Sequence, residues 1–128
     1  VLYLDDDILV GPRTPDLFAA VPCGELGAVV ELHKPQTWHG MHWRSACELY
    51  ELPGCEPKRW RLFNSGLLLL SQRHRSLVED WQRHKLACRV LCDQLFLNAV
   101  AQRERLCVRE LGSAFNYVGS ELRRPAAK

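Results

Sequence analysis

The sequence lacks any hydrophobic run long enough to cross a membrane, and it lacks a strong charge of either sign. Its apolar run "GLLLLS" is far shorter than the roughly 20 residues that a membrane-spanning helix needs. No segment with a basic start, an apolar middle and small residues stands at the front. The formal net charge is only +2, and the basic residues are spread along the chain. We therefore expect no transmembrane segment and no nucleic-acid partner.

The cysteines show no Cys-x-x-Cys spacing, although the chain contains six of them. Cys88 and Cys92 are four residues apart, which is a poor zinc signature without a second pair. We expect buried free thiols, with the disulfides of a Golgi-lumen protein as the alternative. A cytoplasmic location is accordingly favoured over the Golgi lumen.

The composition is that of one globular domain with an ordinary core. The 128 residues are 47% hydrophobic and 25% charged, and no internal repeat or low-complexity tract occurs. The chain opens with Val1 in a pattern typical of mid-strand, and such a strand needs neighbouring strands. We therefore expect residues 1–128 to be a single, incomplete catalytic domain of a longer protein.

The first half of the chain predicts strands and helices separated by a long loop. After an opening strand, Thr14 is expected to cap a short helix with Pro15 at its first position. Small and branched residues over 23–32 predict a buried strand. Residues 33–60 show no sustained period, so we expect a loop with one helical turn at 47–52.

The second half predicts a strand, two helices and a further strand, which gives an α/β layered domain with a mixed sheet. An Asn-Ser-Gly corner at residues 64–66 is expected before a strand at 67–70, and Ser71 can cap the next helix. A second helix should start at Asp93, and a short strand should follow at 106–111. The residues expected to face inward on that second helix are Leu95, Phe96, Ala99 and Val100.

Three consecutive carboxylates, which we term the acidic triplet (residues 5–7), end the apolar segment that opens the chain, "VLYLDDDILV". Adjacent Asp residues repel one another and disfavour a strand interior, so folding stability gives little reason for them. Binding of a divalent cation would explain them. Asp5 and Asp7 would leave a strand end on the same side, so their carboxylates could share a hard cation. Reverse-transcriptase-type polymerase palms, haloacid-dehalogenase-like phosphatases and glycosyltransferases place Asp residues at a strand end of this kind, and the triplet alone does not choose between them.

The first two of these classes need residues that the chain does not supply in the right pattern. A reverse-transcriptase-type palm needs another metal-binding Asp upstream and a basic surface facing nucleic acid. A haloacid-dehalogenase-like phosphatase could use Asp5 and Asp7, with Ser71 and Lys85 further on, but no later Asp-Asp pair exists. Both classes are kept as minor alternatives.

Polar groups flank the apolar runs in a fixed order: the acidic triplet, the Asn-Ser-Gly of residues 64–66, and Asp93 with Gln94. Each has a purely structural explanation, because Asp93 can cap its helix and Asn64 can make a turn. Together, in this order, they resemble glycosyltransferase family 8, which includes glycogenin and bacterial galactosyltransferases that build lipooligosaccharide. The matching segments are "LYLDDDILV", "FNSGLLLLS", "DQLFLN" and "SAFNYV".

The resemblance implies a GT-A fold and transfer of a hexose from a nucleotide sugar, most often UDP-linked, with retention of anomeric configuration. The acceptor hydroxyl could belong to a glycan, a lipid or a protein. Mn2+ or Mg2+ is the implied cofactor, held by Asp5 and Asp7, and it would assist departure of the nucleotide diphosphate. Asp93 and Gln94 are the implied catalytic residues, with the Gln94 carboxamide near the anomeric carbon. The implied substrate-binding residues are Asp6, Asn64, Ser65, Gly66, Asp93 and Gln94.

Two parts of the family pattern do not occur in the sequence. One is the C-terminal His-aromatic-x-Gly-x-x-Lys-Pro-Trp block, which holds the remaining metal ligand, and the other is the base-binding strand that precedes Asp-x-Asp. We therefore expect weak or no transfer by these 128 residues alone, and a non-catalytic or truncated binding module is the alternative. One of the five histidines, His33, His39, His42, His74 or His84, could replace the missing ligand. His39 and His42 are three residues apart, but loop histidines more often face solvent.

Overall fold

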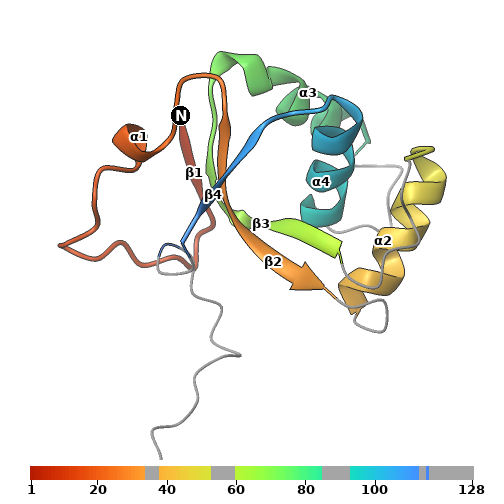
Figure 1. The fold of residues 1–128 in the computed structure, drawn as a ribbon, viewed down its shortest axis with the longest axis horizontal. Coiled ribbons are helices and arrows are strands. Elements are labelled where there is room, and N and C mark those ends of the chain that lie inside the picture. The colour runs from red at the N-terminus through yellow and green to blue at the C-terminus, as the bar shows by residue number, and fades with distance from the viewer. Residues whose placement is uncertain (34–37, 53–59, 85–92, 113–114, 116–128) are drawn as a thin grey trace, which may run out of the picture.

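The computed structural model describes residues 1–33, 38–52, 60–84, 93–112 and 115. Its centre is a four-stranded sheet in the order β1–β3–β2–β4 (Figure 1). Both β1 and β2 pair antiparallel with β3, whereas β4 pairs parallel with β2. The predicted α/β class with a mixed sheet is therefore confirmed. The strands are β1 (Leu2–Leu4), β2 (Leu26–His33), β3 (Trp60–Leu69) and β4 (Val108–Leu111).

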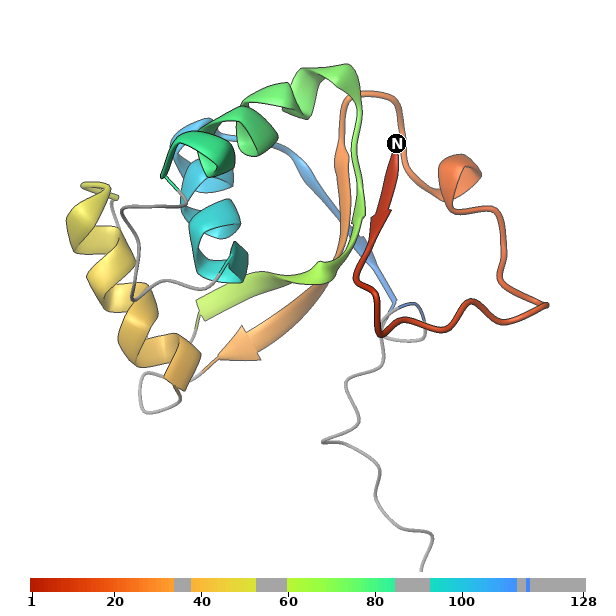
Figure 2. The ribbon, with the colours of Figure 1, turned by 180° about the vertical axis from the view of Figure 1, so that it is seen from behind.

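Helices lie on both sides of this sheet. The short helix α1 lies on one side, and α2, α3 and α4 lie on the other, as both opposite views show (Figures 1 and 2). No helix in the described part of the chain is long and apolar enough to cross a membrane. The helices are α1 (Leu17–Ala20), α2 (Trp38–Leu49), the 3-10 turn η1 (Gln72–His74), α3 (Arg75–His84) and α4 (Asp93–Arg103).

Both faces of the sheet are buried, because side chains alternate along each strand. On the side of α1, the core consists of Leu17, Val21, Val29, Leu67, Leu69 and Leu111. On the side of α3 and α4, it consists of Leu26, Ala28, Phe63, Leu68, Leu77, Phe96, Val100 and Ala101. The inward face predicted for α4 is confirmed, since all four residues expected there are fully buried.

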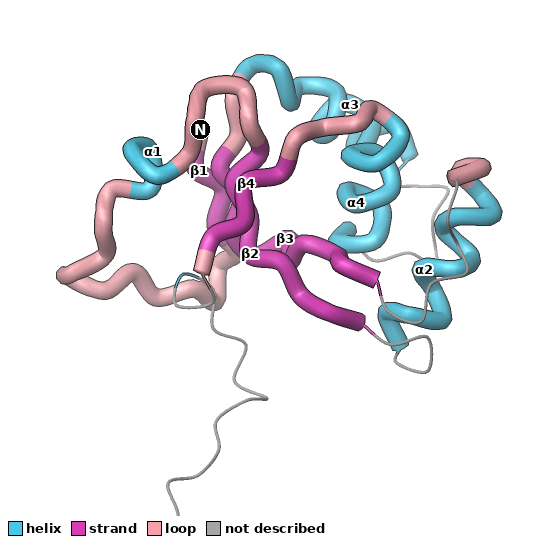
Figure 3. The backbone as a smooth tube through the Cα atoms, in the orientation of Figure 1, coloured by secondary structure: helices cyan, strands magenta, loops and turns pink. Residues whose placement is uncertain are grey.

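A bulge interrupts β3 at the polar residues 64–66. Along the β2–β3 ladder, Ala28 pairs with Leu68 and Val30 pairs with Phe63. Between these pairs β2 has the single residue Val29, whereas β3 has four residues, 64–67, so β3 carries three extra residues. An odd number of extra residues reverses the alternation, and Phe63 and Leu68 can therefore both face the helices. Figure 3 shows β2 and β3 bending along their length.

The strand predicted at 67–70 is confirmed over 67–69, but the predicted corner at 64–66 is wrong, because β3 is one strand that runs through the bulge. The polar composition does suit a turn. However, β1 and β2 pair on either side of β3 and hold its backbone extended.

The predicted loop at 33–60 is also wrong over residues 38–46, which belong to α2, whereas the helical turn predicted at 47–52 overlaps the end of this helix. One face of α2 carries Trp43, Ala46 and Cys47, which are buried against Leu95 and Ala99 of α4. Packing of this kind stabilises a helix that has few local signals of its own. His39 and His42 consequently lie on a helix and not in a loop.

The start of α1 differs from the prediction by two residues. Asp16, and not Thr14, caps the helix, since the Asp16 carboxylate accepts from the backbone N–H groups of Phe18 and Ala19. The Thr14 hydroxyl instead donates to the Gly11 carbonyl, at 2.8 Å, and closes the preceding turn.

Ser71 caps the helical segment after β3 as predicted. Its hydroxyl accepts from the Arg73 N–H, and its own N–H donates to Nδ1 of His74 at 3.0 Å. His74 is only 1% exposed. Burial is the largest influence on the ring and lowers the pKa of His74, because a buried imidazolium loses its hydration.

The described cysteines are free thiols. Cys47 is buried, as predicted, but Cys23 and Cys107 are exposed. The prediction is wrong for these two, which precede β2 and β4 in the chain. The predictions that fall outside the described residues concern Cys55, Cys88, Cys92 and all of "SAFNYV" except Phe115.

Candidate functional site

The acidic triplet lies in a turn directly after β1. The Ile8 N–H donates to the Asp5 carbonyl at 3.3 Å, and the Asp5 N–H donates to the Gly66 carbonyl of the bulge at 2.9 Å. Asp5 is half-buried, whereas Asp6 and Asp7 are exposed. We expected Asp5 and Asp7 to point to the same side because alternate residues of a strand do so. That reason is wrong here, because the triplet lies in a turn and not in a strand.

The bulge of β3 is shaped by its own asparagine. Oδ1 of Asn64 accepts from the Gly66 N–H at 2.8 Å, and Nδ2 donates to Oε1 of Glu31 on β2 at 3.2 Å. An asparagine that bonds the backbone two residues on forms a local turn, which stabilises the bulge. The structure thus gives Asn64 a role in shaping the site, and its contact with a sugar stays a prediction.

The bulge is joined to the start of α4 by a side-chain hydrogen bond. Ser65 is buried, and its hydroxyl donates to Oδ2 of Asp93 at 3.2 Å. The next residue, Gln94, is also buried, and within the described part of the chain its Nε2 has no hydrogen-bond partner. An unmet buried amide costs about 1–3 kcal/mol. Such a group is therefore suited to a contact with a bound molecule.

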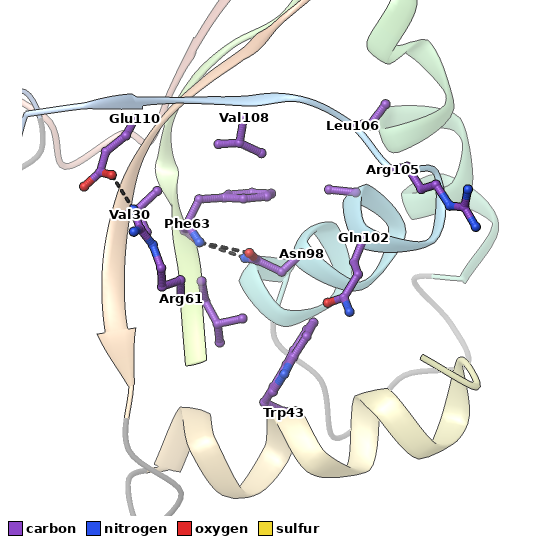
Figure 4. A pocket seen from close by; sticks show the side chains of 12 residues that line it. Val30, Trp43, Arg61, Phe63, Asn98, Gln102, Arg105, Leu106, Val108 and Glu110 are labelled. Carbon is purple, nitrogen blue, oxygen red and sulfur yellow. Dashed lines mark hydrogen bonds and ion pairs between the residues drawn. The ribbon is translucent and has the colours of Figure 1, made fainter. Parts of the chain in front are cut away.

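One turn further along α4, Asn98 fixes the helix to β3. Its Oδ1 accepts from the Phe63 N–H at 2.9 Å, while Nδ2 donates to the carbonyls of Phe63 and Gln94, each at 2.8 Å (Figure 4). Asn98 stands in the sequence motif "DQLFLN", but the sequence reasoning gave it no role. The signal that could have found it is an asparagine four residues after Gln94 on an apolar helix face.

Tyr3 links β1 to the carboxylates, and sequence reasoning did not single it out. Its hydroxyl donates to Oδ1 of Asp5 at 2.8 Å. That hydrogen bond, partial burial and the negative charges of Asp5, Asp93 and Asp6 raise the pKa of Tyr3 to about 12. Charges from both the triplet and α4 thus act on one phenol. The three predicted polar segments therefore meet beside the bulge of β3, where β1 ends.

This acidic corner, formed by the triplet, residues 64–66 and the start of α4, has the chemistry of a hard-cation site. Carboxylate oxygens are the preferred ligands of Mg2+ and Mn2+. Among the described residues, Oδ2 of Asp5 and Oδ1 of Asp93 have no hydrogen-bond partner. Among the same residues, no three His, Cys, Asp or Glu side chains gather closely enough to hold a metal ion by themselves. Water or a bound molecule would have to supply the remaining ligands of an ion held here.

A separate hollow of about 520 Å³ lies between the sheet, α4 and α2 (Figure 4). Its polar lining is largely engaged within the protein, because Asn98 bonds to β3 and Arg61 forms an ion pair with Glu110. Trp43 closes its α2 side and is almost fully buried. None of the predicted site residues lines this hollow.

A second hollow, of about 760 Å³, lies on the α1 side of the sheet and is mainly apolar. Leu4 and Ile8, which flank the acidic triplet, are part of its lining, and Arg13 and Thr14 are its polar members. It offers few groups that could bind sugar hydroxyls, so the acidic corner is the better candidate for a polar substrate.

The chain matches no protein-family model, no curated protein and no solved structure. The functional interpretation therefore depends on the geometry of the acidic corner and on the resemblance of its motifs.

Proposed function

We propose that this chain carries the donor site of a glycosyltransferase with a GT-A fold. The reaction would move a hexose from a nucleotide sugar, most often UDP-linked, to an acceptor hydroxyl of a glycan, lipid or protein, with retention of configuration. Mn2+ or Mg2+ would be the cofactor. The four segments that resemble glycosyltransferase family 8 motivate this choice of reaction.

The observation that carries the proposal is the meeting of three separate polar segments at one place. Asp5 is bonded to Gly66 through the backbone, and Ser65 is bonded to Asp93 through side chains. These residues are up to 88 positions apart, from Asp5 to Asp93, and each could have served a local structural purpose in isolation. Such convergence supports a binding site, and so does the Gln94 Nε2 atom, which has no hydrogen-bond partner among the residues that the structure describes.

The chemistry of each residue suits a part in this reaction. Asp5 and Asp7 would hold the metal ion, which when bound neutralises charge on the leaving diphosphate. Asp93, with one carboxylate oxygen unpaired among the described residues, would accept hydrogen bonds from hydroxyls of the donor sugar. The Gln94 carboxamide would direct its dipole at positive charge developing on the anomeric carbon.

The test is a calorimetric titration of UDP into the chain with and without Mn2+, comparing wild type with Asp7→Asn. We expect Mn2+ to be required and Asp7→Asn to weaken binding about tenfold or more, since a charged contact is worth about 1.5–3 kcal/mol. The matched control is Asp16→Asn, which removes the same charge from the cap of α1, where Asn serves equally well. The proposal would be contradicted if UDP bound equally well with and without Mn2+, or if a folded sample did not bind UDP.

A non-catalytic binding module is the second possibility. UDP release from UDP-hexoses, with water or a sugar as acceptor, requires the glycosidic bond to break, so any release above that of Asp7→Asn would exclude a binding module. An intact donor does not decide between the two, because weak or no transfer is expected of these 128 residues alone. Within the described part of the chain, the buried Nε2 of Gln94 has no hydrogen-bond partner, and a bound hydrogen-bond acceptor in either kind of site would remove that cost.

A further inference from the structure

Tyr3 stands on the face of the sheet where α4 begins. It pairs with Leu68, which belongs to the core on the side of α3 and α4, and residues directly opposite in an antiparallel pair share a face. Its neighbours Leu2 and Leu4 contact the core on the α1 side. Tyr3 is nevertheless 44% exposed, so burial of its ring does not explain its position.

The backbone of Asp5 is fixed, but its side chain needs a separate restraint. The Asp5 N–H is bonded to Gly66 of the bulge, which places the Cα atom. The carboxylate is followed by two further Asp residues, whose charges favour its rotation away from them. Among the described residues, the Tyr3 hydroxyl is the only hydrogen-bond partner of that carboxylate, with its oxygen 2.8 Å from Oδ1.

We propose that Tyr3 is a positioning residue for the acidic corner, holding Asp5 Oδ1 so that Oδ2 is presented to a divalent cation. This inference depends on the function proposed above and gives a role to Tyr3, a residue of the matching segment "LYLDDDILV" to which the resemblance assigned none. Hydrogen bonds of this kind orient metal-binding carboxylates, and their loss commonly lowers metal affinity by about 10–100-fold.

A phenol is well suited to this position because it donates a hydrogen bond without adding a charge. A Lys or Arg side chain would also orient Asp5, but its positive charge would cancel that of the carboxylate and compete with the cation. A neutral donor keeps the full negative charge of the corner available.

The experiment titrates Mn2+ alone into the full 128-residue chain and measures free Mn2+ by electron paramagnetic resonance. We expect Tyr3→Phe to raise the dissociation constant for Mn2+ about tenfold or more, with the thermal unfolding temperature close to that of wild type. Tyr50→Phe is the matched control, because it removes the same hydroxyl from a ring that packs edge-on against Phe96, with centroids 6.1 Å apart. We expect this control to bind Mn2+ like wild type.

A double-mutant cycle with Asp5→Asn separates a positioning role from a general loss of structure. If Tyr3 acts through Asp5, Tyr3→Phe has no further effect on Mn2+ affinity once Asp5 is Asn. An equal loss in both backgrounds, or wild-type affinity in Tyr3→Phe, would overturn this inference and leave the proposed function standing. If wild type binds no Mn2+ at all, both proposals fail.

Discussion

Replacement of Asn98 by Ala tests whether one side chain fixes α4 to β3. Asn98 is 6% exposed and makes three hydrogen bonds to backbone groups, two of them to Phe63. Alanine can make none of these bonds. The Gln94 carbonyl keeps a partner, because it lies four residues before Asn98 and accepts the helical N–H bond of that residue. The N–H and carbonyl of Phe63 lose the partner that they have now.

The expected cost follows from these two groups. A buried backbone group left without a partner costs about 1–3 kcal/mol, which gives about 2–6 kcal/mol for the pair. Alanine regains about 0.5 kcal/mol of helix propensity over Asn. We therefore expect Asn98→Ala to lower the free energy of unfolding by about 2–5 kcal/mol. Because domains are stable by only about 5–15 kcal/mol, the effect should be large.

The assay is urea unfolding followed by circular dichroism, with the free energy of unfolding taken by linear extrapolation. Gln102→Ala is the control, since Gln102 is exposed one turn further along α4, and we expect a change within about 0.5 kcal/mol. Hydrogen exchange gives a local check, because the Phe63 amide should lose protection in Asn98→Ala. A loss of less than about 1 kcal/mol with an unchanged denaturant slope would refute the reasoning.

Two further predictions concern stability. Because burial holds the pKa of His74 below its unfolded value of about 6.5, its contribution is complete above that pH and is lost as the pH falls towards the folded pKa. The unfolding temperature of wild type should fall between pH 7.5 and 5 more steeply than that of His74→Gln, and parallel curves would contradict this. Gly27→Ala should lower the free energy of unfolding by about 1–3 kcal/mol, because the new Cβ would lie 2.7 Å from Val21 Cγ2 and 3.0 Å from Leu69 Cβ. Gly112→Ala, whose Cβ meets nothing within 4 Å, is the control, and equal thermal melts of the two variants would disprove the steric argument.

The predictions that held are those with strong local signals. The inward face of α4 follows from helical spacing, and the cap at Ser71 follows from its own hydroxyl. The helix α2 was missed because its signal is not local: Trp43 and Ala46 are buried by residues of α4 and β3 far along the chain. Tertiary packing stabilises such a helix, and a periodicity argument does not detect it.

The candidate site also combines local and non-local features. Its residue types and their order are visible in the sequence, and the three polar segments were identified there. The sequence did not predict how these segments lie relative to one another, because their placement depends on three extra residues in β3 and on the pairing of β1 with β3. Tyr3 was missed for the same reason, since its importance comes from the carboxylates that gather around its hydroxyl.

By itself, the sequence determined the α/β class, the burial of the sheet and the presence of a carboxylate-rich segment after the first strand. These properties depend on hydrophobic periodicity and on the chemistry of consecutive residues, which act over a few positions. Only the tertiary structure decided that the acidic triplet is a turn, that residues 64–66 form a bulge, and that Asp93 is bonded to Ser65. Such features require backbone groups from distant segments to satisfy one another, and that condition is set by strand pairing across the whole fold.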